Sequence, residues 1–205
     1  MRRAELSADL LAQIEALHEE GDRIFERFER DVRSMAFHPF KPANYRAMVD
    51  ELLPFVGECR TFLEWGSATG IIAITADLLG FDACGIEIDA DLVAIARDLA
   101  RRHRSSARFA AGSMLPAGYR WRAPSGDPRL GTIEEGEPGY VELGMDLTAF
   151  DLVYGYPWSG EAAMMHDIMQ RCGADGARLM INRGREGVHV FRISNGNMRD
   201  RTGTS

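Results

Sequence analysis

The chain has 205 residues, and its 24 basic and 31 acidic side chains give a formal net charge of −7 at pH 7. Apolar residues make up 45% and charged residues 27%, a composition typical of a globular protein that excludes disorder, collagen and coiled coil for the chain as a whole. The length favours one domain. The acidic balance weighs against a protein that coats nucleic acid phosphates, since such binding needs a basic face.

Targeting and redox signals are weak throughout the sequence. No stretch approaches the ~20 apolar residues of a membrane span, and the opening MRRAELSADLLAQIEAL lacks the apolar core of a secretory signal. Cys59, Cys84 and Cys172 are far apart and form no CxxC or Cys/His cluster, which indicates reduced thiols rather than a disulfide or zinc framework. We therefore expect a cytoplasmic protein with no membrane contact and no metal site.

The first predicted element is helical and covers residues 7–35. Ser7 is a suitable N-cap, and apolar side chains recur behind it at helical spacing. Gly21 is a point at which this segment could divide into two helices. Two prolines in FHPFKPANY then break the pattern, because proline disfavours helix at the preceding residue. Residues 1–42 are thus expected to form an N-terminal helical segment, followed by a further helix over 43–56.

From residue 60 onward, short apolar segments alternate with helical ones. The expected strands cover residues 61–65, 83–88, 107–114, 150–156 and 177–183. The helices between them are expected to start after Gly70, at an Asp89 cap and at a Ser159 cap. Such alternation implies a mostly parallel sheet with helices on both faces, and right-handed crossovers make it doubly wound.

Two segments depart from this alternation. Residues 116–148 contain four prolines and six glycines, and a long irregular insertion of this kind is usually a lid, a binding loop or disorder. Residues 188–193 follow the fifth strand too closely for a parallel crossover, so they are expected to form one terminal antiparallel strand. Residues 194–205 are expected to be a flexible tail.

The segment EWGSATG, between the first strand and its helix, is the most informative part of the sequence. Ligands of open α/β sheets bind outside the carboxyl ends of the strands, beside the first strand. Gly66 and Gly70 would let a ligand approach the backbone closely there. Glu87 lies at the carboxyl end of the second strand, where a carboxylate can accept both hydroxyls of a ribose. The pattern therefore predicts a nucleoside-type cofactor.

The order of these motifs, ExGxxxG, strand, acid, strand and then DLVY, resembles that of class I S-adenosylmethionine-dependent methyltransferases over about residues 40–193. The resemblance implies a Rossmann-like methyltransferase fold over 43–193, with the N-terminal segment as a lid, and S-adenosyl-L-methionine as the cofactor. The cofactor-binding residues that it implies are Glu64, Gly66, Ser67, Thr69 and Gly70 for the methionine half, Glu87 for the ribose, Ile88, Ser113 and Met114 for the adenine, and Tyr154.

Three features depart from the family pattern. Ala68 stands where the family usually has its middle glycine, which narrows the freedom of the loop. Ser113 stands where many members have an aspartate that binds the adenine amino group. The chain also stops soon after one antiparallel strand, whereas the full family fold continues with a crossover helix and strand. The resemblance therefore implies a shortened sheet.

The segment YGYPWSGE follows the fourth strand, where the family brings the substrate to the methyl group. Members that methylate planar amino groups often have Asn- or Asp-Pro-Pro-aromatic there, but Tyr156 replaces the Asn or Asp and Trp158 follows a single proline. The two rings could stabilise the sulfonium by cation–π attraction, worth about 0.5–2 kcal/mol, or stack on a planar substrate. The alternative is a proline turn in which both rings only pack.

A substrate that loses a proton during methylation needs a base. Glu161, His38 and Tyr156 are the candidates in the predicted catalytic region, and His166 is a weaker one that is better explained by packing. Each of them also has an ordinary structural explanation; for Glu161 it is the favourable position of an acid in the first turn of a helix. His18, His103 and His189 have no partner that the sequence identifies.

The sequence thus predicts methyl transfer from S-adenosylmethionine to an O or N atom of a small molecule, by an in-line displacement that depends on positioning. Two alternatives stay open: a catalytically inactive protein that binds S-adenosylmethionine or a partner, and a nucleotide-dependent oxidoreductase. The second is disfavoured because a nicotinamide site wants GxGxxG, and Glu64 would repel a pyrophosphate. A nucleic acid substrate is not expected, and the sequence leaves open whether the chain forms an oligomer.

Overall fold

The computed structural model describes residues 3–32, 43–121, 136–158 and 160–200. Within them, seven strands form one sheet in the order β3-β2-β1-β4-β5-β6-β7. The strands are β1 Thr61–Trp65, β2 Asp82–Glu87, β3 Arg108–Ala111, β4 Leu152–Gly155, β5 Arg178–Asn182, β6 Val188–Ser194 and β7 Asn197–Asp200. The first five strands are parallel, and β6 and β7 pair antiparallel. The predicted mostly parallel, doubly wound sheet is confirmed.

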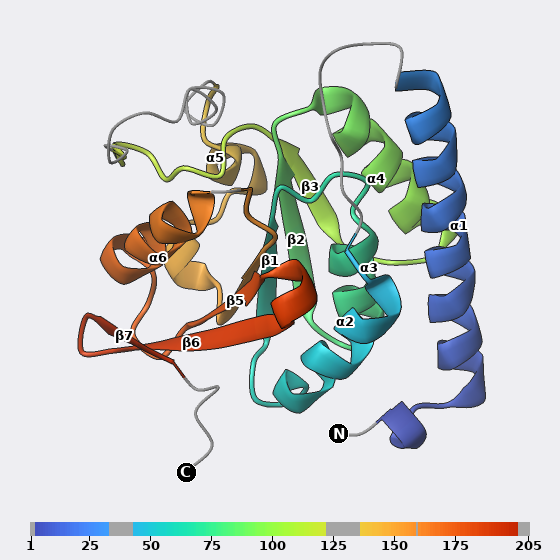
Figure 1. Ribbon diagram of the computed structural model, residues 1–205, viewed down its shortest axis with the longest axis horizontal. Coiled ribbons are helices and arrows are strands. Elements are labelled where there is room, and N and C mark those ends of the chain that lie inside the picture. Colours follow the sequence, from blue (N-terminus) through green and yellow to red (C-terminus); the bar gives the residue numbers. More distant parts are fainter. Residues whose placement is uncertain (1–2, 33–42, 122–135, 159, 201–205) are drawn as a thin grey trace.

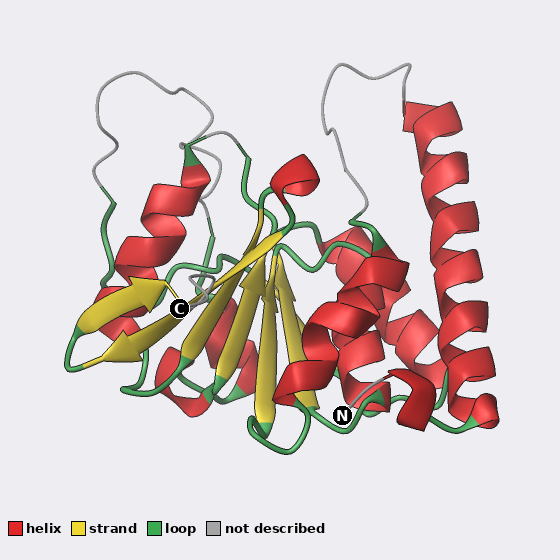
Figure 2. Ribbon diagram, turned by 60° about the horizontal axis from the view of Figure 1, so that its bottom comes forward, coloured by secondary structure: helices red, strands yellow, loops and turns green. Residues whose placement is uncertain are grey.

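Helices cover both faces of this sheet (Figure 2). The α-helices are α1 Ala8–Val32, α2 Tyr45–Leu52, α3 Ile71–Leu78, α4 Ala90–Arg102, α5 Gly139–Leu143 and α6 Glu161–Cys172, and short 3-10 turns cover Arg3–Glu5, Leu53–Phe55, Leu147–Ala149 and Gly184–Glu186. One apolar core joins the sheet to α1, α2, α3 and α4, and a second joins its other face to α5 and α6. In the part of the chain described, no helix is long and apolar enough to cross a membrane.

Helix α1 runs along the outside of α3 and α4 (Figure 1). Its start is capped as predicted, because the Ser7 hydroxyl accepts a hydrogen bond from the Leu10 N–H at 3.2 Å. The predicted division at Gly21 is wrong, since α1 is continuous through that residue. A Cβ atom at Gly21 would lie 2.9 Å from the Ile71 side chain and 3.2 Å from the Tyr45 ring. This glycine therefore lets two helices approach closely and does not end one.

The C-terminal hairpin differs from the expectation of a single antiparallel strand. Strand β7 lies within the predicted tail, 194–205, and pairs with β6 from Ser194 opposite Asn197. The turn between them is Asn195-Gly196, whose φ angles are +52° and +71°. Two consecutive positive φ angles give a hairpin turn whose twist matches that of the strands, and Asn-Gly is its preferred sequence. The pair of strands extends the sheet beyond β5 without a crossover helix.

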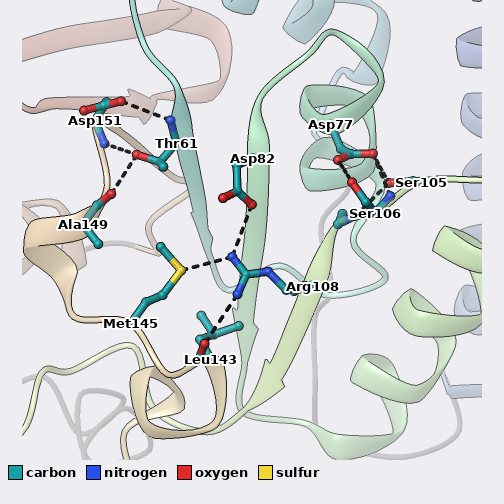
Figure 3. A network of polar contacts seen from close by, with 11 residues as sticks. Thr61, Asp77, Asp82, Ser105, Ser106, Arg108, Leu143, Met145, Ala149 and Asp151 are labelled. Atoms are coloured by element: carbon teal, nitrogen blue, oxygen red, sulfur yellow. Dashed lines mark hydrogen bonds and ion pairs between the residues drawn. The ribbon is translucent and has the colours of Figure 1, made fainter.

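Polar contacts join the segments that lead into the strands, at the amino-terminal ends of β1, β3 and β4 (Figure 3). Asp151, just before β4, accepts hydrogen bonds from the backbone N–H groups of Arg60 and Thr61 at 2.7 and 3.1 Å. In the reverse direction, the Asp151 N–H donates a hydrogen bond to the Thr61 hydroxyl at 2.8 Å. Nearby, Asp77 on α3 accepts three hydrogen bonds from residues 105–106, which lead into β3. These contacts fix the chain where the strands begin.

The outer edge of β3 is covered by two side chains. Arg97 on α4 donates to the Phe109 carbonyl oxygen from Nε at 3.2 Å and from a terminal nitrogen at 2.6 Å. Glu142 on α5 accepts from the Ala111 N–H at 2.8 Å and also forms an ion pair with Arg97. Helix α5 is thereby attached to the edge of the sheet.

Candidate functional site

The loop between β1 and α3 takes the conformation that its glycines allow. Gly66 and Gly70 have φ angles of +66° and +77°. A Cβ atom at Gly70 would lie 2.5 Å from the Phe109 ring, so this position tolerates no side chain, whereas one at Gly66 would meet nothing within 4 Å. Ala68, at the position of the family's middle glycine, has φ +45° and so takes a glycine-like conformation that is strained for alanine.

Glu64 lies on β1 just before this loop, opposite Gly85 of β2 and Tyr154 of β4. Its side chain is only 5% exposed, and one carboxylate oxygen accepts a hydrogen bond from the Ala73 N–H of α3 at 2.9 Å. Burial raises the pKa of Glu64 well above its ordinary value, the Ala73 N–H partly offsets that rise, and the nearby charge of Glu87 adds to it. A cation beside Glu64 would reverse this shift by favouring the ionised form.

Glu87 ends β2 and lies on the other side of the loop. Its Oε2 accepts from the Ala68 N–H at 2.9 Å, and its Oε1 accepts from the Asp89 N–H at 3.0 Å. Each carboxylate oxygen has two lone pairs, so each can take one more donor. Asp89 itself caps α4 as predicted, accepting from the backbone N–H groups of the first turn. Glu87 thus fixes the loop and can also hold a diol.

The three residues expected at the adenine lie at the ends of β2 and β3. Ile88 follows β2 and is 49% exposed, an unusual degree for an isoleucine beside the core. Ser113 is buried, its hydroxyl accepts from the Leu115 N–H at 3.1 Å, and its backbone pairs with Pro138. The carbonyl oxygen of Met114 accepts a hydrogen bond from the Tyr140 hydroxyl at 2.9 Å.

Tyr154 reaches the same edge of the sheet from β4. It is 1% exposed, and burial raises the pKa of its hydroxyl, which therefore stays protonated. Its oxygen accepts from the Asn182 side-chain amide at 3.1 Å, and the amide oxygen of Asn182 accepts from the Gly184 N–H at 2.8 Å. Sequence reasoning missed Asn182; its place at the carboxyl end of β5 was the available signal.

The structure describes some of the predicted catalytic residues, among them Trp158 and Glu161, and not others. Trp158 is 43% exposed, and its backbone N–H donates to Glu161 Oε2 at 2.7 Å. The Glu161 N–H in turn donates to the Trp158 carbonyl oxygen at 3.1 Å, which closes the turn into α6. Helix α6 begins at Glu161, and both the predicted cap Ser159 and the predicted catalytic His38 lie outside the described residues. Glu161 therefore has a structural contact, while its catalytic role stays a prediction.

Two histidines have partners that the sequence did not reveal. Thr75 donates its hydroxyl proton to the Ile71 carbonyl oxygen, so His18 Nε2 must donate to Thr75 Oγ1, 3.0 Å away. Burial lowers the pKa of His18 from 6.5 to about 4. His103 lies 2.8 Å from Glu20. Both pairs attach α1 to the helices that cover the sheet, and their partners are too far away in the sequence for any local signal.

The residues around the loop fit the cofactor that the fold implies. The Ser67 hydroxyl is buried and, within the described residues, has no hydrogen-bond partner. Neither Glu64 nor Glu87 forms an ion pair in the described part of the chain, and Thr69 is also buried beside them. An amino acid ammonium or a sulfonium would compensate the buried carboxylate, and ribose hydroxyls would use the free lone pairs of Glu87.

Comparison with known proteins supports the fold. No protein-family profile and no curated protein matches the chain by sequence. Among solved structures, an RNA methyltransferase from Salinibacter ruber in complex with S-adenosyl-L-homocysteine is 19% identical, with a TM-score of 0.50 over 75% of this chain and 92% of that chain. An O-methyltransferase from Bacillus cereus in complex with S-adenosylhomocysteine is 14% identical, with a TM-score of 0.49 over 83% of this chain and 65% of that chain. The likeness to the Salinibacter ruber enzyme, which covers most of both chains, shows that this chain has the class I methyltransferase fold.

Proposed function

We propose that the chain binds S-adenosyl-L-methionine at the carboxyl edge of the sheet and transfers its methyl group to an O or N atom of a small molecule. The observation that carries the proposal is the pair Glu64 and Glu87, which lie on the two sides of the Gly66–Gly70 loop and both accept hydrogen bonds at that edge. Two carboxylates beside a glycine loop suit a cationic ligand with a diol and repel a pyrophosphate.

The chain's own residues would bind and orient the cofactor, which supplies an activated methyl group when bound. In the proposal, the methionine half is held by Glu64, Gly66, Ser67, Thr69 and Gly70, the ribose by Glu87, and the adenine by Ile88, Ser113 and Met114. Tyr154, protonated and held by Asn182, would donate a hydrogen bond and would not act as a base. The exposed Ile88 side chain supports the adenine assignment, because an adenine face would cover it.

The substrate would bind where β4 and β5 end. Tyr156 and Trp158 flank Pro157, and the half-exposed Trp158 ring can stack on a planar substrate or face the sulfonium. We propose that residues 1–42 and part of 116–148 complete this pocket as a lid. A cytoplasmic setting, in which Cys59, Cys84 and Cys172 stay reduced, is part of the same proposal.

Calorimetric titration with S-adenosylmethionine, S-adenosylhomocysteine and NAD(P) tests the cofactor. We expect micromolar binding of the first two and none of NAD(P). Glu87→Ala should weaken that binding by at least about 1 kcal/mol, the scale of a lost charge-assisted hydrogen bond. The matched control is Glu58→Ala, a carboxylate at the other edge that pairs with Arg178. Unchanged affinity in a folded Glu87→Ala variant would remove the ribose assignment, and NAD(P) binding would favour an oxidoreductase.

One observation favours a second candidate, a protein that binds the cofactor without catalysis. Glu161, a predicted base, is almost buried and is used to close the turn before α6. Release of S-adenosylhomocysteine can be measured with phenol, carboxylate and amine acceptors at saturating cofactor. Turnover with any acceptor supports the enzyme, whereas tight binding with no turnover across the panel supports the inactive alternative.

A further inference from the structure

Two buried hydrogen bonds in series lie at the carboxyl-terminal ends of the strands, next to the residues of the candidate cofactor site. The indole Nε1–H of Trp65 donates to the Tyr140 hydroxyl at 2.8 Å, and that hydroxyl donates to the Met114 carbonyl oxygen at 2.9 Å. Trp65 and Tyr140 are 2% and 5% exposed. Trp65 ends β1 directly before the Gly66–Gly70 loop, and Met114 lies in the loop after β3, so one hydroxyl connects two strand ends that are not neighbours in the sheet.

The segment that supplies Tyr140 is itself held tightly against the strand ends. The Ser113 N–H donates to the Glu137 carbonyl oxygen and the Gly139 N–H donates to the Ser113 carbonyl oxygen, both at 2.9 Å. A Cβ atom at Gly139 would lie 2.7 Å from the Ile86 side chain on β2. One at Gly112 would lie 2.5 Å from the Glu137 carbonyl oxygen. The return of the 116–148 insertion is therefore packed on the ends of β2 and β3.

We propose that Tyr140 is a positioning residue for the cofactor, which sets the separation of the Gly66–Gly70 loop and the 112–115 loop so that a bound adenosine fits between them. The proposal rests on the proposed function, because it assigns the space between these loops to the ribose and adenine. It also gives the insertion a role: one end of it supplies the hydroxyl that ties the end of β1 to the 112–115 loop at a fixed separation.

The hydroxyl is suited to this role because it accepts from Trp65, the last residue of β1 before the Gly66–Gly70 loop, and donates to the 112–115 loop. Tyr140→Phe keeps the ring and removes only the oxygen. It leaves the buried Trp65 N–H without a partner and releases the Met114 carbonyl group, and burying an unpaired donor is unfavourable. The two loops then lose their common contact while the ring still fills the core beside β1.

The test uses the full chain, with two measurements on Tyr140→Phe. Hydrogen exchange of the ligand-free protein should become faster at residues 112–115, and the affinity for S-adenosylhomocysteine and for adenosine should fall by about fivefold or more. The matched control is Thr61→Val. The Thr61 hydroxyl likewise accepts from one backbone group, the Asp151 N–H, and donates to another, the Ala149 carbonyl, but at the amino-terminal edge. It should change neither measurement.

The outcomes separate this inference from the proposed function. Affinity within twofold of the natural chain and unchanged exchange at 112–115, in a folded Tyr140→Phe variant, would overturn the positioning role and leave the proposed function standing. Failure of the natural chain to bind S-adenosylhomocysteine would overturn both. If Tyr140→Phe does not fold, Trp65→Phe serves instead, because it removes the donor and keeps the Tyr140–Met114 bond. A loss of affinity of more than about twofold, with exchange at 112–115 little changed, supports the inference, and affinity within about twofold of the natural chain contradicts it.

Discussion

The two ends of the parallel strands, which we call the amino-terminal and the carboxyl-terminal edge of the sheet, use their polar groups in different ways. At the amino-terminal edge, the carboxylates of Asp77 and Asp151 each accept two or more hydrogen bonds from the chain, and the segments that they join come from distant parts of the sequence. At the carboxyl-terminal edge, Glu64 is buried without a cation in the described chain, and the Ser67 hydroxyl there is buried without a partner. The first set of contacts stabilises the fold, and the second set is the basis of the proposed cofactor site.

This contrast supports the proposed location of the cofactor site. Buried polar groups in proteins nearly always have partners. In the described chain the Ser67 hydroxyl has none, and the buried Glu64 carboxylate has one backbone donor and no cation, but unpaired buried atoms also occur away from this loop, at His18, Trp121 and Arg178. The support for a ligand is therefore that Glu64 and Ser67 lie at the same loop. The glycine loop alone would be weaker support, because many strand-to-helix turns need glycine for geometry. The difference between the edges can be tested by removing one group from each.

The largest expected effect on stability is at the amino-terminal edge. Asp151→Ala removes the acceptor of two backbone N–H groups, and we expect the free energy of unfolding to fall by about 1–2 kcal/mol, a value reduced by the partial exposure of the site. Urea unfolding measures it, with Glu26→Ala, an exposed carboxylate on α1, as the control near zero. S-adenosylhomocysteine affinity should stay the same; a large loss of affinity would mean that the two edges are not independent.

The corresponding change at the other edge is Glu64→Gln, which keeps the shape and removes the charge. We expect affinity for S-adenosylmethionine to fall about tenfold, or about 1.4 kcal/mol. The free energy of unfolding should be unchanged or higher, because glutamine removes the cost of ionising a buried carboxyl group. Calorimetry and urea unfolding measure the two quantities. A variant that loses stability and keeps its affinity would reverse the contrast between the edges.

The pH dependence sharpens this result. The folded pKa of Glu64 is raised above its unfolded value of 4.5, so its contribution to stability is present below pH 4.5 and is lost as the pH rises toward the folded pKa. Affinity for a cationic cofactor should rise over the same range, as Glu64 ionises. Glu64→Gln should flatten both slopes, which denaturation and titration at several pH values would show.

The pH dependence of stability that comes from His18 is opposite to that from Glu64, so the two contributions must be measured separately. Its pKa is lowered from 6.5 to about 4 in the folded chain, so the unfolded chain binds the proton first and stability falls as the pH drops from 6.5 to 4. His18→Gln should remove that loss without changing cofactor affinity. A persistent acid slope in this variant would contradict the assignment.

The smallest expected effect concerns Ala68. Replacement by glycine relieves the positive φ angle at the cost of a more flexible unfolded chain, so the free energy of unfolding should rise by up to about 1 kcal/mol. The control is Ala94→Gly on the exposed face of α4, which should lower it by about 1 kcal/mol because glycine disfavours helix. A loss of stability in Ala68→Gly would show that the loop does not strain this alanine.

Local signals accounted for most of the sheet and the glycine loop. Strand β1 has the predicted bounds, Asp89 caps α4, and the hairpin after β5 follows from the short connection. The Asn195-Gly196 signal was also local, but the polar residues around it favoured a tail. The polar composition of this segment predicts a tail, whereas the Asn195-Gly196 pair correctly indicates a hairpin turn.

The other contacts that sequence reasoning missed mostly join residues far apart in the chain. The sequence allows a helix break at Gly21, because only its packing against Ile71 in the folded chain shows why a glycine is needed there. His18 and Tyr140 have partners 57 and 26 residues away, and no periodicity or motif encodes such pairs. Glu64 and Glu87 could be placed together because parallel strands bring their carboxyl ends to one edge.

The covering of β3 has a consequence for how molecules of this protein meet. An uncovered edge strand offers backbone groups to a strand of another molecule, which is a common route to aggregation. Here the Arg97 guanidinium and the Glu142 carboxylate already take the Phe109 carbonyl and the Ala111 N–H, so an incoming strand would have to displace an ion pair first. Growth of the sheet from this side is thereby opposed, and new strands are left only the β7 side, where Arg199 and Asp200 place charges of both signs.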